Sequence, residues 1–271
     1  MALKWLSLLL ACFIAGCSSP KIPPSTSPST IRVMTYNIHH AEGLDGKVDL
    51  LRIAEIISRE SPDVVALQEV DKGVLRTQRR DLPDELAALT KMTCVFSNNF
   101  HYQGGEYGNA ILTRFPVHAA SNLHYKMLQP IEQRGLLQVV VDFRGQKLVF
   151  MNTHLDYHRD DLERLHNVDE IKETLRGYTG MPAILCGDFN DVPGSRVHAK
   201  QKESFADTWE KVGAGDGYTH SSAKPQKRID YIWIAKDTPV RAVKAWVVES
   251  DASDHLPLVA ELELGLPAKP R

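Results

Sequence analysis

The chain has 271 residues, a length that suits one large domain or two small ones, and its 43% hydrophobic content is typical of a soluble globular core. Its 32 basic and 34 acidic residues give a formal net charge of −2, and no run of lysine or arginine is longer than Arg79-Arg80. A protein that binds the nucleic-acid backbone normally carries a basic stripe, so this balance disfavours duplex DNA as the natural partner.

The first residues have the pattern of a bacterial export signal. Lys4 is followed by an apolar run over residues 5–15, which is shorter than the about 20 residues that a membrane-spanning helix needs. The segment Ile14-Ala15-Gly16-Cys17 resembles the lipoprotein signal, which implies removal of residues 1–16 and lipid modification of Cys17. The alternative is a plain secretory signal with a chance cysteine.

The segment after the signal is expected to be a flexible tether, because residues 17–30 are rich in Ser, Pro and Thr and poor in apolar residues. In a Gram-negative cell, Ser18 favours sorting to the outer membrane, facing the periplasm. We therefore expect a lipid-anchored protein of the cell envelope, with a folded domain over residues 31–264 and a tail over 265–271. We expect a monomer.

The folded part is expected to open with a strand over residues 31–36 that ends at Asn37. Residues 49–59 place apolar side chains at helical spacing and stop before Pro62, as an amphipathic helix should. A second strand over 63–67 is followed directly by a glutamine and a glutamate, Gln68 and Glu69.

The middle of the chain is predicted to be mostly strands. A polar loop (71–81) and a short helix (84–89) lead to a strand at 93–96, and Gly104, Gly105 and Gly108 indicate a loop before the strand 109–113. Further strands are expected at 117–125, 135–143 and 147–152, with Arg144-Gly145 as a hairpin turn. The longest helical pattern covers residues 160–176.

An apolar run over 181–186 then breaks at Gly187 and places Asp188 and Asn190 two positions apart, so that both can point to one side of a strand end. The remaining chain is read as an irregular loop (191–228) with a short helix near 195–202, and strands at 228–234, 240–248 and 258–262. Many neighbouring strands are joined by short turns, so the sheets should be mixed or antiparallel.

Polar side chains follow the apolar strands at many of these ends. Each alone could be a turn, a cap or a satisfied packing residue, since such residues are common where loops begin. Together their oxygen atoms suit a hard cation, Mg²⁺ or Mn²⁺, and phosphate-ester hydrolysis needs such a cation, a base and hydrogen-bond donors. The set is Asn37, Glu69, Asn109, His154, Asp188, Asn190, Asp230, Asp254 and His255.

Eight ordered blocks resemble the endonuclease/exonuclease/phosphatase family, whose members include pancreatic deoxyribonuclease, apurinic endonucleases, neutral sphingomyelinases and inositol polyphosphate 5-phosphatases. The resemblance covers residues 31–262 and implies an α/β fold, a four-layer sandwich of two packed mixed β-sheets flanked by helices. The blocks are Thr35-Tyr36-Asn37, Leu67-Gln68-Glu69-Val70, Gly108-Asn109-Ala110-Ile111-Leu112, Arg134-Gly135, Asn152-Thr153-His154, Gly187-Asp188-Phe189-Asn190, Arg228-Ile229-Asp230-Tyr231 and Ser253-Asp254-His255.

The same resemblance implies roles for the site residues. The metal ligands would be Asn37 and Glu69, with Asp254 close by. The catalytic group would comprise Asp188 acting on the attacking water, Asn190 donating to the phosphoryl oxygen, Asp230 paired with His255, and His154 contacting the phosphate. A carboxylate beside His255 favours its protonated, phosphate-binding form over the role of a base. Substrate-binding residues would be Asn109, Arg134 and Tyr107.

The leading hypothesis is therefore a metal-dependent phosphodiesterase or phosphatase anchored outside the cytoplasm. The alternatives are an anchored or secreted nuclease that scavenges nucleic acid, and a catalytically silent binding module on the same scaffold. Thr219 is a candidate for supporting the site. Cys94 and Cys186 are expected to be buried free thiols. No chemistry is assigned to the remaining histidines considered, which are read as surface or packing residues: His39, His40, His158 and His166.

Overall fold

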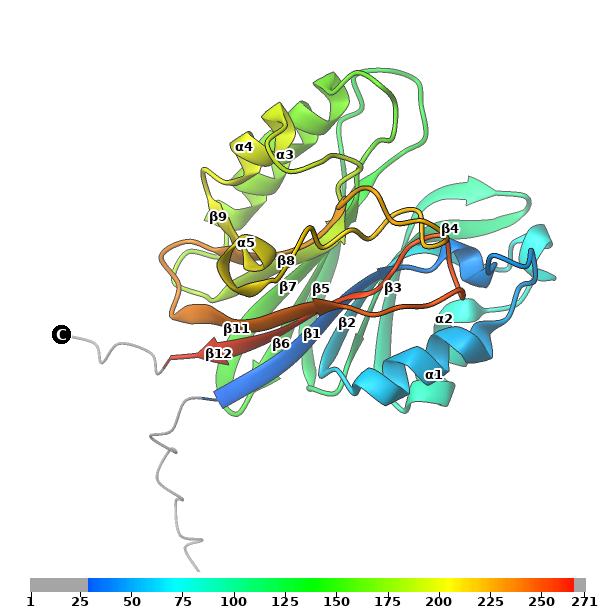
Figure 1. Ribbon diagram of the computed structural model, residues 1–271, viewed down its shortest axis with the longest axis horizontal. Helices are drawn as coiled ribbons and strands as arrows, with labels where there is room; N and C mark the ends of the chain where they lie inside the picture. Colours follow the sequence, from blue (N-terminus) through cyan, green and yellow to red (C-terminus); the bar gives the residue numbers. More distant parts are fainter. Residues whose placement is uncertain (1–28, 266–271) are drawn as a thin grey trace, which may run out of the picture.

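The computed structural model describes residues 29–265, which form two mixed six-stranded sheets (Figure 1). The first sheet has the order β11 (Val240–Val247), β12 (Leu258–Leu264), β1 (Ser29–Asn37), β2 (Val64–Lys72), β4 (Gly105–Thr113), β3 (Thr93–Tyr102). The second has the order β5 (Val117–His124), β6 (Gly135–Phe143), β7 (Gln146–His154), β8 (Ala183–Asp188), β10 (Asp230–Ala235), β9 (Phe205–Asp207). Strands β1 and β2 are parallel, as are β7 and β8.

Helices cover the outer faces of both sheets (Figure 1). The first sheet packs against α1 (Leu50–Glu60) and α2 (Leu82–Thr90), and the second against α3 (Leu162–Arg176) and α4 (Arg196–Gln201). The short α5 (Thr208–Val212) places Trp209 at the core between the sheets. Two 3-10 turns complete the set, η1 (His39–Ala41) and η2 (Leu75–Thr77). The predicted four-layer sandwich is confirmed.

Helix α1 shows why the sequence pattern was informative. The Asp49 side chain accepts the Leu51 N–H and caps the helix, Leu50, Ile53 and Ile57 are buried against the first sheet, and Ser61 ends the helix in a left-handed conformation. Among residues 29–265, no helix combines the length and the apolar character that crossing a membrane requires.

The core between the sheets explains where the polar residues lie. Along each central strand, alternate side chains point inward, so that Val33 of β1, Ala66 of β2 and Cys186 of β8 all join this core. Toward one end of these strands, the inward positions that follow the apolar ones lie at one rim of the two sheets. These rim positions hold Asn37, Gln68, Asn109, Asn152, His154, Asp188 and Asp230, all of them buried. Cys94 packs in a separate cluster, and both it and Cys186 are free thiols.

The structure differs from the sequence prediction around the glycines. Residues 105–108 are strand and not loop, because β3 runs to Tyr102 and β4 begins at Gly105; the two strands pair as a hairpin, and Gly104 lies in its turn. A Cβ atom at Gly108 would lie 1.9 Å from the Ser97 carbonyl oxygen, so this glycine permits a close strand approach. The region predicted as irregular after residue 191 also contains β9 and α5.

A buried amide network joins the two sheets just below the rim. Asn152 of β7 donates from Nδ2 to the carbonyl oxygens of Leu67 (2.8 Å) and Ala110 (2.9 Å), which belong to the other sheet. Its Oδ1 accepts from Gln68 Nε2 at 2.7 Å. Strand β2 has a bulge between Leu67 and Val70, so Asn152 binds at a place where the β2–β4 ladder is interrupted.

Replacing Asn152 by alanine should therefore destabilise the fold by more than about 2 kcal/mol, because it leaves buried carbonyl and amide groups without partners. Urea unfolding of the purified protein measures this change. The control is Asn122→Ala, since within residues 29–265 the Asn122 side chain makes one hydrogen bond, a long one of 3.4 Å to Asn99. Equal stability of the Asn152 variant and the wild-type protein would show that the network does not hold the sheets together.

Candidate active site

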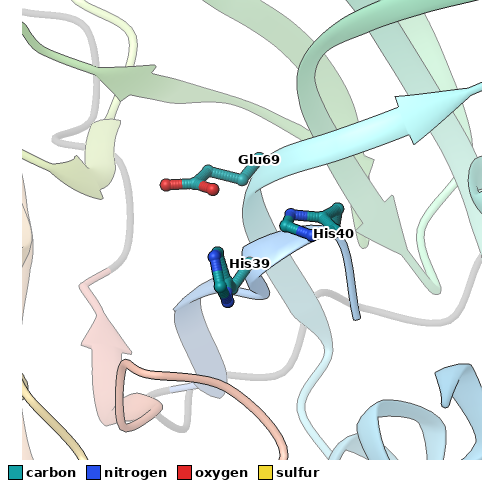
Figure 2. Close-up of side chains that lie close together, drawn as sticks. All are labelled: His39, His40 and Glu69. Atoms are coloured by element: carbon teal, nitrogen blue, oxygen red, sulfur yellow. The ribbon is translucent and has the colours of Figure 1, made fainter. Parts of the chain in front are cut away.

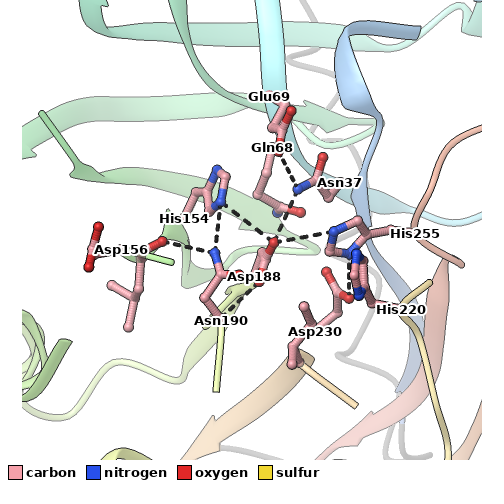
Figure 3. Close-up of polar contacts among 12 residues, drawn as sticks. Asn37, Gln68, Glu69, His154, Asp156, Asp188, Asn190, His220, Asp230 and His255 are labelled. Atoms are coloured by element: carbon pink, nitrogen blue, oxygen red, sulfur yellow. Dashed lines mark hydrogen bonds and ion pairs between the residues drawn. The ribbon is translucent and has the colours of Figure 1, made fainter. Parts of the chain in front are cut away.

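The site lies at the rim where strand ends of both sheets meet (Figure 3). In the second sheet, the pairing of β7, β8 and β10 sets His154 opposite Asp188 and Asp188 opposite Asp230. In the first sheet, Asn37 pairs with Gln68, the residue before Glu69. The alternation of inward side chains therefore places the groups of these paired residues on the same side of their strands, and the β2 bulge interrupts this alternation at Glu69.

Asp188 is at the centre of the group and is fully buried. Its Oδ2 accepts from Asn37 Nδ2 at 3.1 Å and lies 3.5 Å from His154 Nε2 and 3.6 Å from His255 Nε2. Its Oδ1 accepts the Asn190 backbone N–H at 2.9 Å. Burial, together with the Asp230 carboxylate, raises the pKa of Asp188 to about 7. The carboxylate can therefore gain or lose a proton near neutral pH.

Asp230 and His255 form a buried pair. His255 Nδ1 lies 2.9 Å from Asp230 Oδ2, and Thr219 Oγ1 lies 3.3 Å from the backbone nitrogen of Asp230 at the start of β10. Burial alone would lower the pKa of His255, but the Asp230 and Asp188 carboxylates outweigh it and raise this pKa to about 10. His255 is consequently a cation at neutral pH, and Thr219 supports the strand that carries its partner.

His154, in contrast to the cationic His255, is held as a neutral imidazole. Arg134 Nη1 lies 3.0 Å from His154 Nδ1, and because a guanidinium can only donate, that nitrogen is the acceptor and the ring proton is on Nε2. Burial, with the Arg134 charge, lowers the pKa of His154 well below its usual value. The Asn190 side chain donates to the Leu155 carbonyl oxygen at 3.1 Å. Its Nδ2 also lies 3.0 Å from His154 Nε2, and because both nitrogens carry hydrogen this contact is not a hydrogen bond. His154 and Asn190 thus bring neutral polar groups to the centre.

Asn37 connects the Glu69 carboxylate, an expected metal ligand, with the Asp188 carboxylate. Its Nδ2 donates to Glu69 Oε1 at 2.9 Å as well as to Asp188, while its Oδ1 accepts the His39 backbone N–H at 3.0 Å. The donor set fits a hard cation, because carboxylate oxygens from two strands both lie within hydrogen-bond distance of one amide nitrogen here. Two buried oxygens, Gln68 Oε1 and Asp230 Oδ1, have no hydrogen-bond partner among residues 29–265, which also fits a site completed by a ligand.

The other predicted residues surround this centre. Asp254 is partly exposed and contacts His39 Nδ1 at 3.9 Å and His220 Nε2 at 4.0 Å. Asn109 Nδ2 donates to the Gly135 carbonyl oxygen at 3.4 Å, next to Arg134. Tyr107 is buried on the same strand, and burial, followed by the Glu69 charge, raises its pKa well above the usual value. Cys17 lies outside the described residues.

Sequence reasoning missed several residues that position the site. Arg134 is itself held by Glu132 at 2.7 Å, and the Ser253 hydroxyl donates to the Asn37 carbonyl oxygen at 2.8 Å. The His220 ring lies 4.7 Å from that of His255, centroid to centroid. Glu132 and Ser253 lie within or beside the motif blocks, so their positions were a usable signal. His220 lies in the long irregular segment, where no pattern singled it out.

The charge on His255 should depend on Asp230. Burial lowers the pKa of His255, and the Asp230 carboxylate is the largest effect that raises it. Changing Asp230 to Asn removes that charge, so the pKa of His255 should fall from about 10. NMR titration of the imidazole nitrogens measures this directly, and Asp254→Asn is the control, expected to lower the pKa much less. The pKa of His255 in the folded protein exceeds the 6.5 expected in the unfolded chain. Protonated His255 therefore contributes its full stabilisation of the fold below about pH 6.5, and this contribution is lost as the pH rises through about 10. A neutral His255 at pH 7 in the wild-type protein would contradict the assignment.

Comparison with known proteins places this geometry in a family. A protein of Escherichia coli, the uncharacterized protein YbhP, is 27% identical over 261 residues, which is 90% of this chain and all of YbhP. The 5'-tyrosyl-DNA phosphodiesterase of Caenorhabditis elegans is 26% identical over 196 residues, 68% of this chain and 49% of that protein. An endonuclease/exonuclease/phosphatase from Beutenbergia cavernae superposes with a TM-score of 0.74 and 28% identity, covering 89% of this chain and 73% of that one. Residues 34–255 match the sequence profile of the Endonuclease/Exonuclease/phosphatase family, and the chain belongs to that family.

Proposed function

We propose that this protein is a divalent-metal-dependent hydrolase of phosphate esters, a phosphodiesterase or phosphatase that is anchored outside the cytoplasm. The observation that carries the proposal is that carboxylate, amide and imidazole side chains gather at one place on the rim (Figure 3). Two carboxylates, Glu69 and Asp188, are linked through Asn37, and Nε2 of the cationic His255 lies 3.6 Å from Asp188 Oδ2. An anionic phosphoryl group with an incoming water fits this combination.

Each group then has a role that follows from its state. Asp188, with a pKa of about 7, is suited to accept a proton from the attacking water at neutral and mildly alkaline pH. His255, kept protonated by Asp230, supplies positive charge toward the phosphoryl oxygens. His154 and Asn190 supply hydrogen-bond donors from the opposite side of the site, and Arg134 fixes the ring of His154.

The metal ion would be held by Glu69, with Asn37 and Asp254 as the further ligands predicted from sequence. When bound, a divalent cation supplies charge that neutralises the phosphoryl oxygens. The oxygen donors favour Mg²⁺ or Mn²⁺ as this ion. In the present geometry Asn37 Oδ1 accepts the His39 N–H, while its Nδ2 faces the Glu69 carboxylate.

Hydrolysis of bis(4-nitrophenyl) phosphate tests the proposal. Turnover should require added Mg²⁺ or Mn²⁺ and should fall at least about a hundredfold in Glu69→Ala and in His255→Ala, because each removes a charge from the reacting centre. Two matched controls, Glu55→Ala on the exposed face of α1 and His166→Ala on α3, should keep wild-type turnover. Turnover in both site variants equal to that of the wild-type protein would refute the assignment.

The nuclease alternative is tested with the same protein. The similarity to a 5'-tyrosyl-DNA phosphodiesterase is the observation that favours a nucleic-acid substrate. Salt-sensitive cleavage of plasmid DNA or RNA at rates above those for small esters would favour the nuclease, whereas inert nucleic acid beside active small-ester hydrolysis would favour the leading proposal.

The proposed location rests on the N-terminal sequence, in particular on Cys17. If Cys17 carries the lipid, Cys17→Ser should abolish incorporation of labelled palmitate and move the protein from the membrane fraction to the soluble fraction. Ser18→Ala serves as the matched control and should keep the label. Label and membrane association that both persist in the Cys17 variant would rule out this anchor.

A further inference from the structure

Two histidines and a glutamate converge beside the proposed phosphoesterase centre (Figure 2). His39 and His40 lie in η1, directly after β1, and Glu69 lies in the bulge of β2. One potential ligand atom from each of the three side chains lies within 4.8 Å of the others. The rings of the two histidines are 4.4 Å apart, centroid to centroid, at 66° to one another.

The backbone that presents these side chains is in an unfavourable conformation. His39 and His40 both have φ of 45°, Ala41 has 67° and Glu69 has 58°, all in the left-handed region that non-glycine residues rarely adopt. His39 and His40 are the central residues of a tight turn closed by the Ala41 N–H and the Ile38 carbonyl oxygen (2.8 Å), a place where glycine would carry no strain. Such strain is concentrated at functional sites, where it sets the direction of a side chain.

One residue, Glu42, orients both imidazoles. Its carbonyl oxygen lies 3.3 Å from His39 Nδ1, and its carboxylate lies 3.5 Å from His40 Nε2. The other nitrogen of each ring is thereby left for a different partner. The His40 side chain is only 6% exposed, and its Nδ1 atom is buried without a hydrogen-bond partner among residues 29–265. Metal-binding histidines typically have this arrangement, with one ring nitrogen held by a carbonyl or carboxylate and the other on the metal.

A second cluster of similar composition lacks these features. His198, Asp207 and Glu210 also lie within ligand distance of one another. However, Arg228 binds Asp207 at 2.7 Å and Lys202 binds Glu210 at 2.6 Å. The carboxylates of that cluster already have cationic partners, so it is an ion-pair network.

We propose that His39, His40 and Glu69 form a binding site for a divalent transition-metal ion, of the class Fe²⁺, Co²⁺ or Zn²⁺. Two imidazoles and one carboxylate are a ligand set that such ions accept and that Mg²⁺ does not favour. Glu69 is shared with the oxygen-rich centre, where its Oε1 accepts from Asn37. This metal site is separate from the proposed phosphoesterase activity, and binding of the metal ion can be measured without an activity assay.

The test is titration of the purified, untagged, chelator-treated full-length protein with Co²⁺, followed by visible absorption and by calorimetry. Wild-type protein should bind Co²⁺ with the absorption of imidazole coordination, and excess Mg²⁺ should not displace it. His39→Ala and the volume-conserving His40→Gln should each weaken binding at least about tenfold, since even residues that only orient metal ligands have effects of that size. Circular dichroism checks that each variant is folded. If His40→Gln, a change at a buried residue, unfolds the protein, the Co²⁺ affinity of His39→Ala alone tests the proposal.

Two controls separate this site from others. His101→Ala removes an exposed histidine of β3, and His198→Gln removes the histidine of the ion-pair network; both variants should bind Co²⁺ like the wild-type protein. Wild-type affinity in His39→Ala would overturn the proposal, as would a loss of binding in His198→Gln. Because binding is the readout, a failed phosphoesterase assay leaves this result unaffected, and failed Co²⁺ binding leaves the phosphoesterase assay unaffected.

Discussion

The structure depends on the burial of two carboxylates, Asp188 and Asp230, at adjacent positions of one sheet. Two such charges cannot remain ionised without compensation, and His255 supplies it by pairing with Asp230 and approaching Asp188. His255 comes from the segment before β12, which belongs to the other sheet. The electrostatic balance of the site therefore requires that the two sheets pack face to face at this rim.

The remaining features of the site follow from the same convergence. The Asn152 network fixes the separation of the sheets directly below the rim, and Asn37 spans it by binding a carboxylate from each sheet. Polar groups buried in this way stabilise the fold only when all partners are present. Two oxygens of this rim, Gln68 Oε1 and Asp230 Oδ1, have no hydrogen-bond partner among residues 29–265, which fits a place completed by a ligand.

Much of this could be predicted from the sequence, because strand alternation is a local property. The inward positions of β1 and β8 end in Asn37 and Asp188, and the eight ordered motif blocks identified the family that the profile match confirms. His39 and His40 were read as surface or packing residues, since neither the left-handed backbone nor the contacts of Glu42 are visible in a sequence. The extent of β3 and β4 was also missed, because glycines that permit close strand contact look like loop residues.

A crystal structure of the protein grown with Mn²⁺ and inorganic phosphate would test the central claim most directly. Anomalous scattering should place a manganese ion at the Glu69 carboxylate, with phosphate oxygens in contact with His255, His154 and Asn190. Phosphate bound to another face of the molecule, with no metal ion at Glu69, would contradict the proposal that this rim hydrolyses phosphate esters.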